Sequence, residues 1–258
     1  MSCLDPAVRG LARRRLLTLH HESRMGHVGG ALSCIDAILV LFHGHLRDRD
    51  EFVLSKGHAV TALYTALWSV GVLDEDALQT FALEGTALAA HPPIDRVKGI
   101  NFATGSLGHG VSLAAGSALG ARFNGEDSHV FCLTSDGEWQ EGSTWEALAF
   151  AVHHQLENLT VLIDDNGLQA FGRTREVAAL GPLGPRIRGF GVAVDEVDGH
   201  DVDAIDAALA LAVGGPRVIV LRTVKGSGVE SIEDRLESHY LPLDDEQYRK
   251  AVESERFA

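Results

Sequence analysis

Two short apolar runs, each ending in an acidic turn, constrain the fold of this 258-residue chain more than any other feature. The first run, residues 129–133, leads into SDGE, and the second, residues 159–163, leads into DDNG. A helix-length segment separates them, so residues 134–169 read as turn, helix, strand and turn after a first strand. When a helix connects two parallel strands, both turns fall at the same sheet edge, where open α/β sheets bind ligands.

The two turns place Asp136 and Asn166 thirty positions apart in the sequence, and we expect the crossover to bring them side by side. A carboxylate and an amide oxygen that converge there suit a hard cation such as Mg²⁺, which usually keeps phosphate oxygens in its shell. Each dipeptide alone, DG or NG, is an ordinary turn signal. Their spacing and the flanking strands favour a Mg²⁺-diphosphate site.

Helical and strand patterns alternate along the rest of the chain. Helices are expected at residues 6–22, 33–42, 59–70, 74–83, 109–123, 202–213 and 244–254, and further strands at 51–54, 192–197 and 217–224. Residues 25–31, 84–110 and 172–191 read as irregular segments. Because the strongest strands are apolar throughout, the pattern predicts an α/β fold with a mostly parallel sheet covered by helices on both faces. We expect one domain over residues 1–258.

Composition narrows the classes of partner and location. The net charge of −14 argues against non-specific binding to nucleic acid or to an anionic membrane, and it favours a soluble cytoplasmic protein. The three cysteines, Cys3, Cys34 and Cys132, form no CxxC pair, which fits reduced thiols. The longest apolar stretch, residues 37–42, is too short to cross a bilayer.

Residues 134–169 closely resemble the thiamine-diphosphate motif, and within that superfamily they are most similar to transketolase. Further matching segments are GHVGGALSCIDAI, LSKGHAVTALYTAL, AHPP, TGSLGHGVSLAAGSALGAR and TVKGSGV, and together the resemblance covers roughly residues 10–245. The family joins this diphosphate-binding domain to a pyrimidine-binding domain and a C-terminal domain. This chain is about as long as the first alone. The resemblance therefore implies the N-terminal subunit of a split transketolase, which forms an α₂β₂ assembly with a C-terminal partner.

The resemblance also implies site residues. Asp136 and Asn166 match the side-chain ligands of Mg²⁺ (or Ca²⁺ or Mn²⁺), and the backbone carbonyl of Leu168 matches the third ligand. The implied cofactor-binding set is His58, Gly105, Ser106, Leu107, Asp136, Gly137, Glu138, Asn166 and His239. The implied catalytic set is His27, His58 and His91, because imidazoles donate to oxyanions or shuttle protons near neutral pH. The alternative for any single histidine is a structural side chain.

Three positions carry further expectations. Glu141 matches a carboxylate relay between two active sites, and its alternative is a glutamate favoured by the helix dipole. Ser135 stands where the family usually has Gly, and Ser106 stands where the longest transketolases have Pro. We expect the change at Ser135 to be tolerated because Asp136 and Gly137 remain, and we expect the turn at Ser106 to be less rigid without the proline ring.

The implied activity is transfer of a two-carbon ketol unit from a ketose to an aldehyde, with sugars or sugar phosphates as substrates. The glutamate that activates the cofactor belongs to the pyrimidine-binding domain, so this chain would work only with its partner. Two alternatives stay open: a related enzyme of specialised metabolism, and a non-catalytic subunit with a binding or regulatory role. The possibility of a nicotinamide dehydrogenase is disfavoured because no GxGxxG fingerprint follows a strand.

Overall fold

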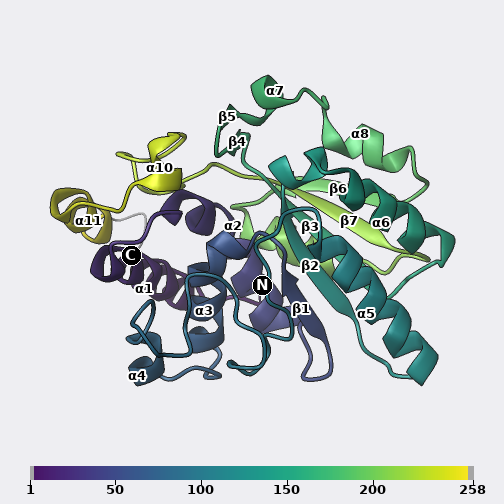
Figure 1. Ribbon diagram of the computed structural model, residues 1–258, viewed down its shortest axis with the longest axis horizontal. Helices are drawn as coiled ribbons and strands as arrows, with labels where there is room; N and C mark the ends of the chain where they lie inside the picture. The colour runs from purple at the N-terminus through teal and green to yellow at the C-terminus, as the bar shows by residue number, and fades with distance from the viewer. Residues whose placement is uncertain (1–2, 255–258) are drawn as a thin grey trace.

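A five-stranded parallel sheet with the order β1-β2-β3-β7-β6 forms the centre of the computed structural model, which describes residues 3–254 (Figure 1). Its strands are β1 (Glu51–Leu54), β2 (Val130–Ser135), β3 (Leu159–Asp165), β6 (Ala193–Asp198) and β7 (Arg217–Arg222). Each neighbouring pair runs parallel. The predicted α/β fold with a mostly parallel sheet is confirmed.

Helices cover both faces of the sheet because alternate strand residues feed two cores. Phe131 and Leu133 belong to the core under the first helices and α9, whereas Val130 and Cys132 belong to the core under α5, α6 and α8. The helical elements are α1 (Pro6–Ser23), α2 (Val28–Val40), η1 (Leu41–His45), η2 (Gly57–Ala59), α3 (Val60–Ser69), α4 (Glu75–Leu78), α5 (Gly110–Asn124), η3 (Gly137–Gln140), α6 (Gly142–His153), α7 (Thr174–Val177), α8 (Leu183–Arg188), α9 (Val202–Ala210), α10 (Glu237–Tyr240) and α11 (Asp245–Val252).

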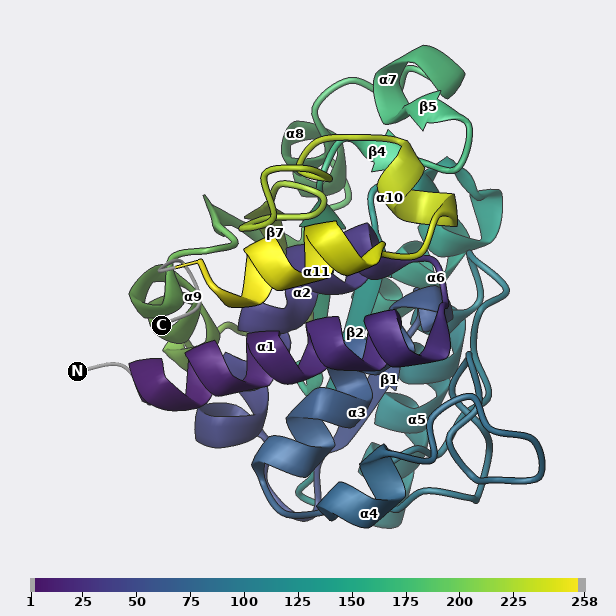
Figure 2. The ribbon, with the colours of Figure 1, turned by 90° about the vertical axis from the view of Figure 1, so that its left-hand side faces the viewer.

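The C-terminal part of the chain returns to its beginning. Figure 2 shows α11 lying alongside α1, and the Thr18 and Tyr248 hydroxyls are 3.0 Å apart between the two helices. A short antiparallel pair, β4 (Leu168–Gln169) and β5 (Gly172–Arg173), follows β3. Neither this pair nor α10 is expected from the sequence, because elements this short carry no periodic signal.

Helix α2 begins at Val28, so the expected loop at residues 25–31 and the expected start at Ser33 are wrong. Gly29 lies in the first turn because α10 packs closely there: a Cβ at Gly29 would lie 2.2 Å from the Ser238 Oγ. The apolar helical stretch continues to His45 and is long and apolar enough to cross a membrane, but 78% of it is buried inside the protein. We therefore interpret Val28–His45 as a core helix.

Two expected helices are shorter than predicted. Residues 74–83 form only the four residues of α4, and Ala82 has a positive φ of 60° that interrupts any continuation. Helix α9 ends at Ala210, three residues before the predicted end at 213. The irregular segment that follows α4 reaches α5 and carries His91 and the Gly105–Leu107 turn to the carboxyl edge of the sheet.

A buried ion-pair network joins α1, α2 and the turn after β6. The Asp36 carboxylate is fully buried and accepts hydrogen bonds from Arg9 Nε at 2.8 Å and Arg13 Nη1 at 2.9 Å. The ring of His200 lies 3.2 Å from the same carboxylate. Burial raises the pKa of Asp36, but the Arg13 charge and the bonds from His200 and Arg9 outweigh it and hold that pKa well below its usual range.

We expect Asp36→Asn to lower the free energy of unfolding by about 3–5 kcal/mol at pH 7, because it removes a buried carboxylate that Arg9, Arg13 and His200 all contact. Urea denaturation of both proteins measures the difference. The folded pKa of Asp36 lies below its unfolded value, so this stabilisation is present above the unfolded pKa and is lost as the pH falls through the folded pKa.

The matched control is Asp48→Asn, because Asp48 is exposed on the loop before β1. Its expected effect is within about 0.5 kcal/mol. Equal unfolding midpoints for the two variants would show that the Asp36 network contributes nothing.

Candidate functional site

The two acidic turns lie side by side at the carboxyl edge of the sheet, as their spacing predicts. Parallel pairing of β2 with β3 places Ser135 opposite Asp164. The Asp136 amide donates to the Asp164 carbonyl at 3.1 Å. The Asp136 Oδ2 in turn accepts from the Gly167 amide at 3.0 Å. The turns are therefore held together by direct hydrogen bonds.

The Asp136 carboxylate is buried without an ion-pair partner among residues 3–254. Only 3% of the residue is exposed, and its oxygens accept from the Gly137 amide at 2.8 Å and the Thr174 hydroxyl at 2.6 Å. Burial raises the pKa of Asp136, the Thr174 bond opposes this, and the nearby Asp164 carboxylate adds to the rise. A divalent cation at this position would offset the cost of burying the charge.

Asn166 and Leu168 supply further oxygens beside Asp136. The Asn166 side chain donates from Nδ2 to Asp164 Oδ2 at 2.9 Å, which fixes the amide and directs its Oδ1 toward the Leu168 amide at 3.0 Å. The Leu168 carbonyl accepts from Lys225 Nζ at 3.1 Å and has a second lone pair. A carboxylate, an amide oxygen and a carbonyl form an all-oxygen set of the kind Mg²⁺ prefers, so these residues fit a hard cation.

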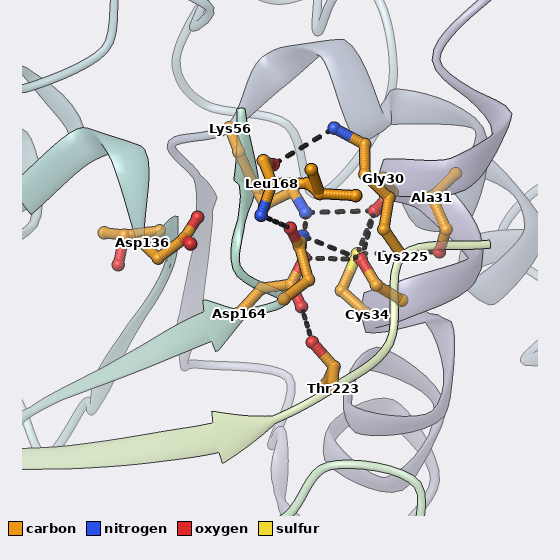
Figure 3. A network of polar contacts seen from close by, with 12 residues as sticks. Gly30, Ala31, Cys34, Lys56, Asp136, Asp164, Leu168, Thr223 and Lys225 are labelled. Carbon is orange, nitrogen blue, oxygen red and sulfur yellow. Dashed lines mark hydrogen bonds and ion pairs between the residues drawn. The ribbon is translucent and has the colours of Figure 1, made fainter. Parts of the chain in front are cut away.

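Figure 3 shows a fully buried ion pair between Lys56 and Asp164, whose carboxylate also accepts from the Asn166 amide. Lys56 also donates to the Gly30 carbonyl at 2.9 Å, and Asp164 accepts from the Ser33 and Thr223 hydroxyls. Burial raises the pKa of Asp164, but the Lys56 charge outweighs it and lowers that pKa. Figure 3 shows Asp136 to one side of this network. The pair therefore holds the Asn166 amide, and it gives Lys56 and Asp164 a role that the sequence analysis missed.

Three predicted histidines gather in one cluster. The ring centroids lie 5.4 Å apart for His27 and His58, 4.8 Å for His27 and His239, and 5.7 Å for His58 and His239. Burial, followed by the charge of Lys225, lowers the pKa of His239 to about 3. Burial also lowers the pKa of His58 well below its usual value. Both rings are therefore neutral at pH 7, and each offers one N–H donor.

The His91 ring packs against the turn formed by Gly105–Leu107. A Cβ at Gly105, where φ is 133°, would lie 2.6 Å from the His91 Cδ2, so glycine is required for this contact. Burial lowers the pKa of His27, and His91 and Lys225 lower it further. His27, His58 and His239 therefore form one cluster, and His91 lies against the turn at Gly105.

Lys225, just after β7, is a second residue that the sequence analysis passed over. It is 2% exposed. Its Nζ lies 3.1 Å from His239 Nδ1 and donates a hydrogen bond to the Leu168 carbonyl at 3.1 Å. Burial and then the charge of Lys56 lower the pKa of Lys225 to about 8. Its position after a strand, in the segment TVKGSGV, is the signal that could have identified it. Two ammonium groups near one histidine cluster favour an anion there.

Glu138, predicted to bind the cofactor, is buried and contacts protein groups. Its side chain is fully buried and accepts from the Ser55 hydroxyl and, at 2.9 Å, from the Gly108 amide. Burial raises the pKa of Glu138. The residue therefore fastens the turn that carries His58 to the turn that carries Gly105, Ser106 and Leu107, and any effect on a ligand acts through those turns.

A cavity of about 470 Å³ borders the outer side of the cation site. Its lining includes Asp136, Gly167 and Thr174, together with Arg173, Arg175 and Arg222. None of the clustered histidines and neither buried lysine lines it. The histidine cluster, where the polar contacts converge, therefore lies outside this cavity.

Residues 11–256 match the family described as transketolase, thiamine diphosphate binding domain. This chain belongs to that family. It is 37% identical over 252 residues to the 6-deoxy-6-sulfo-D-fructose transketolase subunit SqwG of a Clostridium species, covering 92% of each chain. It is 35% identical to one of the subunits of the apulose-4-phosphate transketolase of Phocaeicola vulgatus, covering 93% of this chain and 89% of that one. Family membership makes the chain part of a transferase enzyme of the transketolase type.

Solved transketolases share the fold. The enzyme from Leishmania mexicana superimposes with a TM-score of 0.89 at 26% identity, covering 98% of this chain and 42% of that chain. The enzyme from Campylobacter jejuni gives 0.88 at 29% identity, with 96% and 42% covered. This transketolase-family chain therefore spans about 42% of the length of those enzymes. The oxygen ligands and the adjacent basic groups are compatible with the binding of thiamine diphosphate, after which the family is named.

We expect Asp164→Ala to destabilise this transketolase-family chain by about 3–5 kcal/mol, because it leaves the Lys56 ammonium buried and unpaired. The neighbouring Asp165→Ala is the matched control, since Asp165 pairs with Arg222, whose side chain is 46% exposed. That change should cost about 1 kcal/mol or less. Chemical denaturation measures both, and a larger loss for Asp165→Ala would contradict the role given to the buried pair.

Proposed function

We propose that this chain is the N-terminal subunit of a two-component transketolase that binds thiamine diphosphate through Mg²⁺. The observation that supports this best is the convergence of Asp136, Asn166 and Leu168 oxygens beside a buried carboxylate without an ion-pair partner in the described structure. Ca²⁺ and Mn²⁺ also take oxygen ligands and are expected to substitute.

The cofactor's diphosphate is proposed to lie between this cation and the basic groups. Lys225 supplies a positive charge beside His239, and the neutral rings of His58 and His239 supply N–H donors. Gly137 has no Cβ, so its backbone leaves space for the phosphates while its amide holds the Asp136 carboxylate. Ser106 is exposed on the turn that Glu138 fastens to the His58 turn, which leaves it accessible to the same ligand.

When bound, thiamine diphosphate supplies the carbon nucleophile that breaks and remakes the ketose carbon–carbon bond. The residues of this chain bind, orient and transfer protons around that centre. His27 and His91 are proposed to donate to the substrate's oxygens or to accept a proton from them, and their lowered pKa values support this by keeping their rings neutral at pH 7.

A partner subunit is proposed to complete the site. The chain spans about 42% of the solved transketolases, and relatives that it matches along 92% and 89% of their length are named as subunits. The partner would contribute the pyrimidine-binding and C-terminal domains, in an α₂β₂ assembly in the cytoplasm. Glu141 is exposed at the start of α6, where a carboxylate relay between two active sites would need it.

The substrates are proposed to be sugars that carry an anionic group. The names of two relatives specify 6-deoxy-6-sulfo-D-fructose and apulose-4-phosphate, which are a sulfonated and a phosphorylated sugar. Donor ketose and aldehyde acceptor would both reach the histidine cluster from the side that the partner covers.

We expect Asp136→Ala to abolish binding of thiamine diphosphate in the presence of Mg²⁺, because it removes the only charged ligand of the proposed cation set. Calorimetry on the reconstituted two-subunit complex measures the binding. Transferase activity should appear when the partner is added to the wild-type chain and should be absent with the variant.

The control is Asp165→Ala, which removes a neighbouring carboxylate and should keep binding within about threefold, a change of less than 1 kcal/mol. High activity of the chain without a partner would contradict the two-component proposal. Cofactor affinity unchanged in Asp136→Ala would contradict the cation site.

Cofactor affinity should fall as the pH rises through about 8, since Lys225 loses its proton near that value in the free protein. The affinity can fall by at most about tenfold per pH unit, and it does so if only the protonated lysine binds the diphosphate. Titration of inorganic pyrophosphate with Mg²⁺ between pH 7 and 9 measures this without involving catalysis.

Lys225→Met should bind more weakly and lose this pH dependence. Lys56 does not titrate in this range, because Asp164 overcomes the effect of burial and raises its pKa. A pH dependence that persists in Lys225→Met would assign the effect to another group.

A further inference from the structure

A thiol, an imidazole and a carboxylate from distant parts of the sequence meet on another part of the molecule. The Cys3 Sγ, a ring nitrogen of His45 and a carboxylate oxygen of Asp206 all lie within 4.8 Å of one another. Cys3 precedes α1, His45 ends η1 and Asp206 lies in α9. The closest pair is His45 Nε2 and Asp206 Oδ1, at 2.7 Å.

The backbone that carries His45 has an unusual conformation. Helix α2 changes at Leu41 into the π-helical turn η1, and the Leu46 amide donates to the Leu41 carbonyl at 2.8 Å, five residues back. Such π-helical turns are rare and occur frequently at functional sites. The turn brings Gly44 against Cys3, where a Cβ would lie 2.5 Å from the Sγ. The absence of a side chain at Gly44 therefore makes room for the thiol.

This cluster is separate from the thiamine-diphosphate site. His45 lies six residues before the first residue of β1, at the amino-terminal edge of the sheet, whereas Asp136 and Asn166 follow the carboxyl ends of β2 and β3. His45 also lines a cavity of about 450 Å³ whose other lining residues include Asp50 and His129, and none of the cofactor-site residues. The cavity gives an ion access to the imidazole from solvent.

The exposure of the three groups suits an ion that binds from solution. The His45 side chain is 16% exposed and that of Asp206 is 28% exposed. Cys3 is exposed, so an ion from solution can reach its thiol. That thiol donates a hydrogen bond to the Val40 carbonyl at 3.6 Å, which metal binding would replace.

We propose that Cys3, His45 and Asp206 bind a borderline-soft divalent ion, with Zn²⁺ as the best match. Thiolate, imidazole and carboxylate are the usual zinc ligands, and a site with three protein ligands keeps a fourth position for water. Tetrahedral zinc needs ligand atoms about 3.5 Å apart, so the Cys3 thiol would move closer, and His45 and Asp206, now 2.7 Å apart, would separate slightly. Mg²⁺ is a poor match because it prefers oxygen ligands.

Bound zinc would join the segment before α1 to η1 and α9. The contact between His45 and Asp206 already joins η1 to α9, and a metal ion would add the Cys3 thiolate to that contact. Because its ligands come from three segments, the site would act as a metal cross-link on the side of the molecule away from the cofactor. Zinc affinity should fall in acid, because the thiol must lose its proton to bind the ion.

The test measures zinc on full-length, untagged chain that has been stripped with a chelator. The protein is equilibrated with Zn²⁺ in excess Mg²⁺, desalted, and analysed for metal. Wild-type chain should retain about one zinc per chain, and Cys3→Ser and His45→Ala should bind at least about tenfold more weakly. Cobalt substitution adds a direct readout, since a thiolate-to-cobalt absorption band should be present in the wild type and absent in Cys3→Ser.

Two controls separate this site from other ligands on the chain. His153→Ala removes an exposed histidine that has a histidine neighbour, and Asp136→Ala removes the cofactor-site carboxylate; both should retain zinc. Circular dichroism confirms that each variant is folded. Wild-type chain without zinc, or zinc retention and a cobalt–thiolate band that persist in Cys3→Ser, would overturn the proposal.

Discussion

The cofactor site depends on one buried ion pair. Lys56 and Asp164 are fully buried, so neither charge is stable there without the other. Their remaining hydrogen bonds reach Gly30 and Ser33 in α2, Thr223 after β7 and the Asn166 amide. The same pair therefore locks a helix to two strand ends and fixes the orientation of a proposed cation ligand, which makes stability and ligand binding difficult to separate at this position.

Parallel strand order divides the polar groups of this transketolase-family chain between the two edges of its sheet. The carboxyl edge gathers oxygen ligands, neutral histidines and two lysines, since every strand ends there in a polar turn. The amino edge gathers Cys3, His45 and Asp206, a softer set of ligands. The chemistry of the ligands suits a hard cation at the carboxyl edge and a softer one at the amino edge.

The sequence predicts the sheet and the meeting of Asp136 with Asn166, because strand periodicity and crossover length determine both. It does not predict where α2 begins, because Gly29 and Gly30 signal a loop locally while packing against Ser238 and His58 favours a helix. Lys225 and Asp164 gain their roles from contacts with residues more than fifty positions away. Local patterns carry no such information, and the same reason hides the cluster of Cys3, His45 and Asp206.

Neutral histidines leave the charge balance of the cofactor site to its carboxylates and lysines. The two carboxylates nearest the proposed cation, Asp136 and Asp164, and the two ammonium groups of Lys56 and Lys225 offset each other. A dication alone would add uncompensated positive charge to a buried region, and a diphosphate alone would add uncompensated negative charge. Together they cancel. Cation and diphosphate should therefore bind with positive cooperativity, each raising the affinity for the other by the same factor.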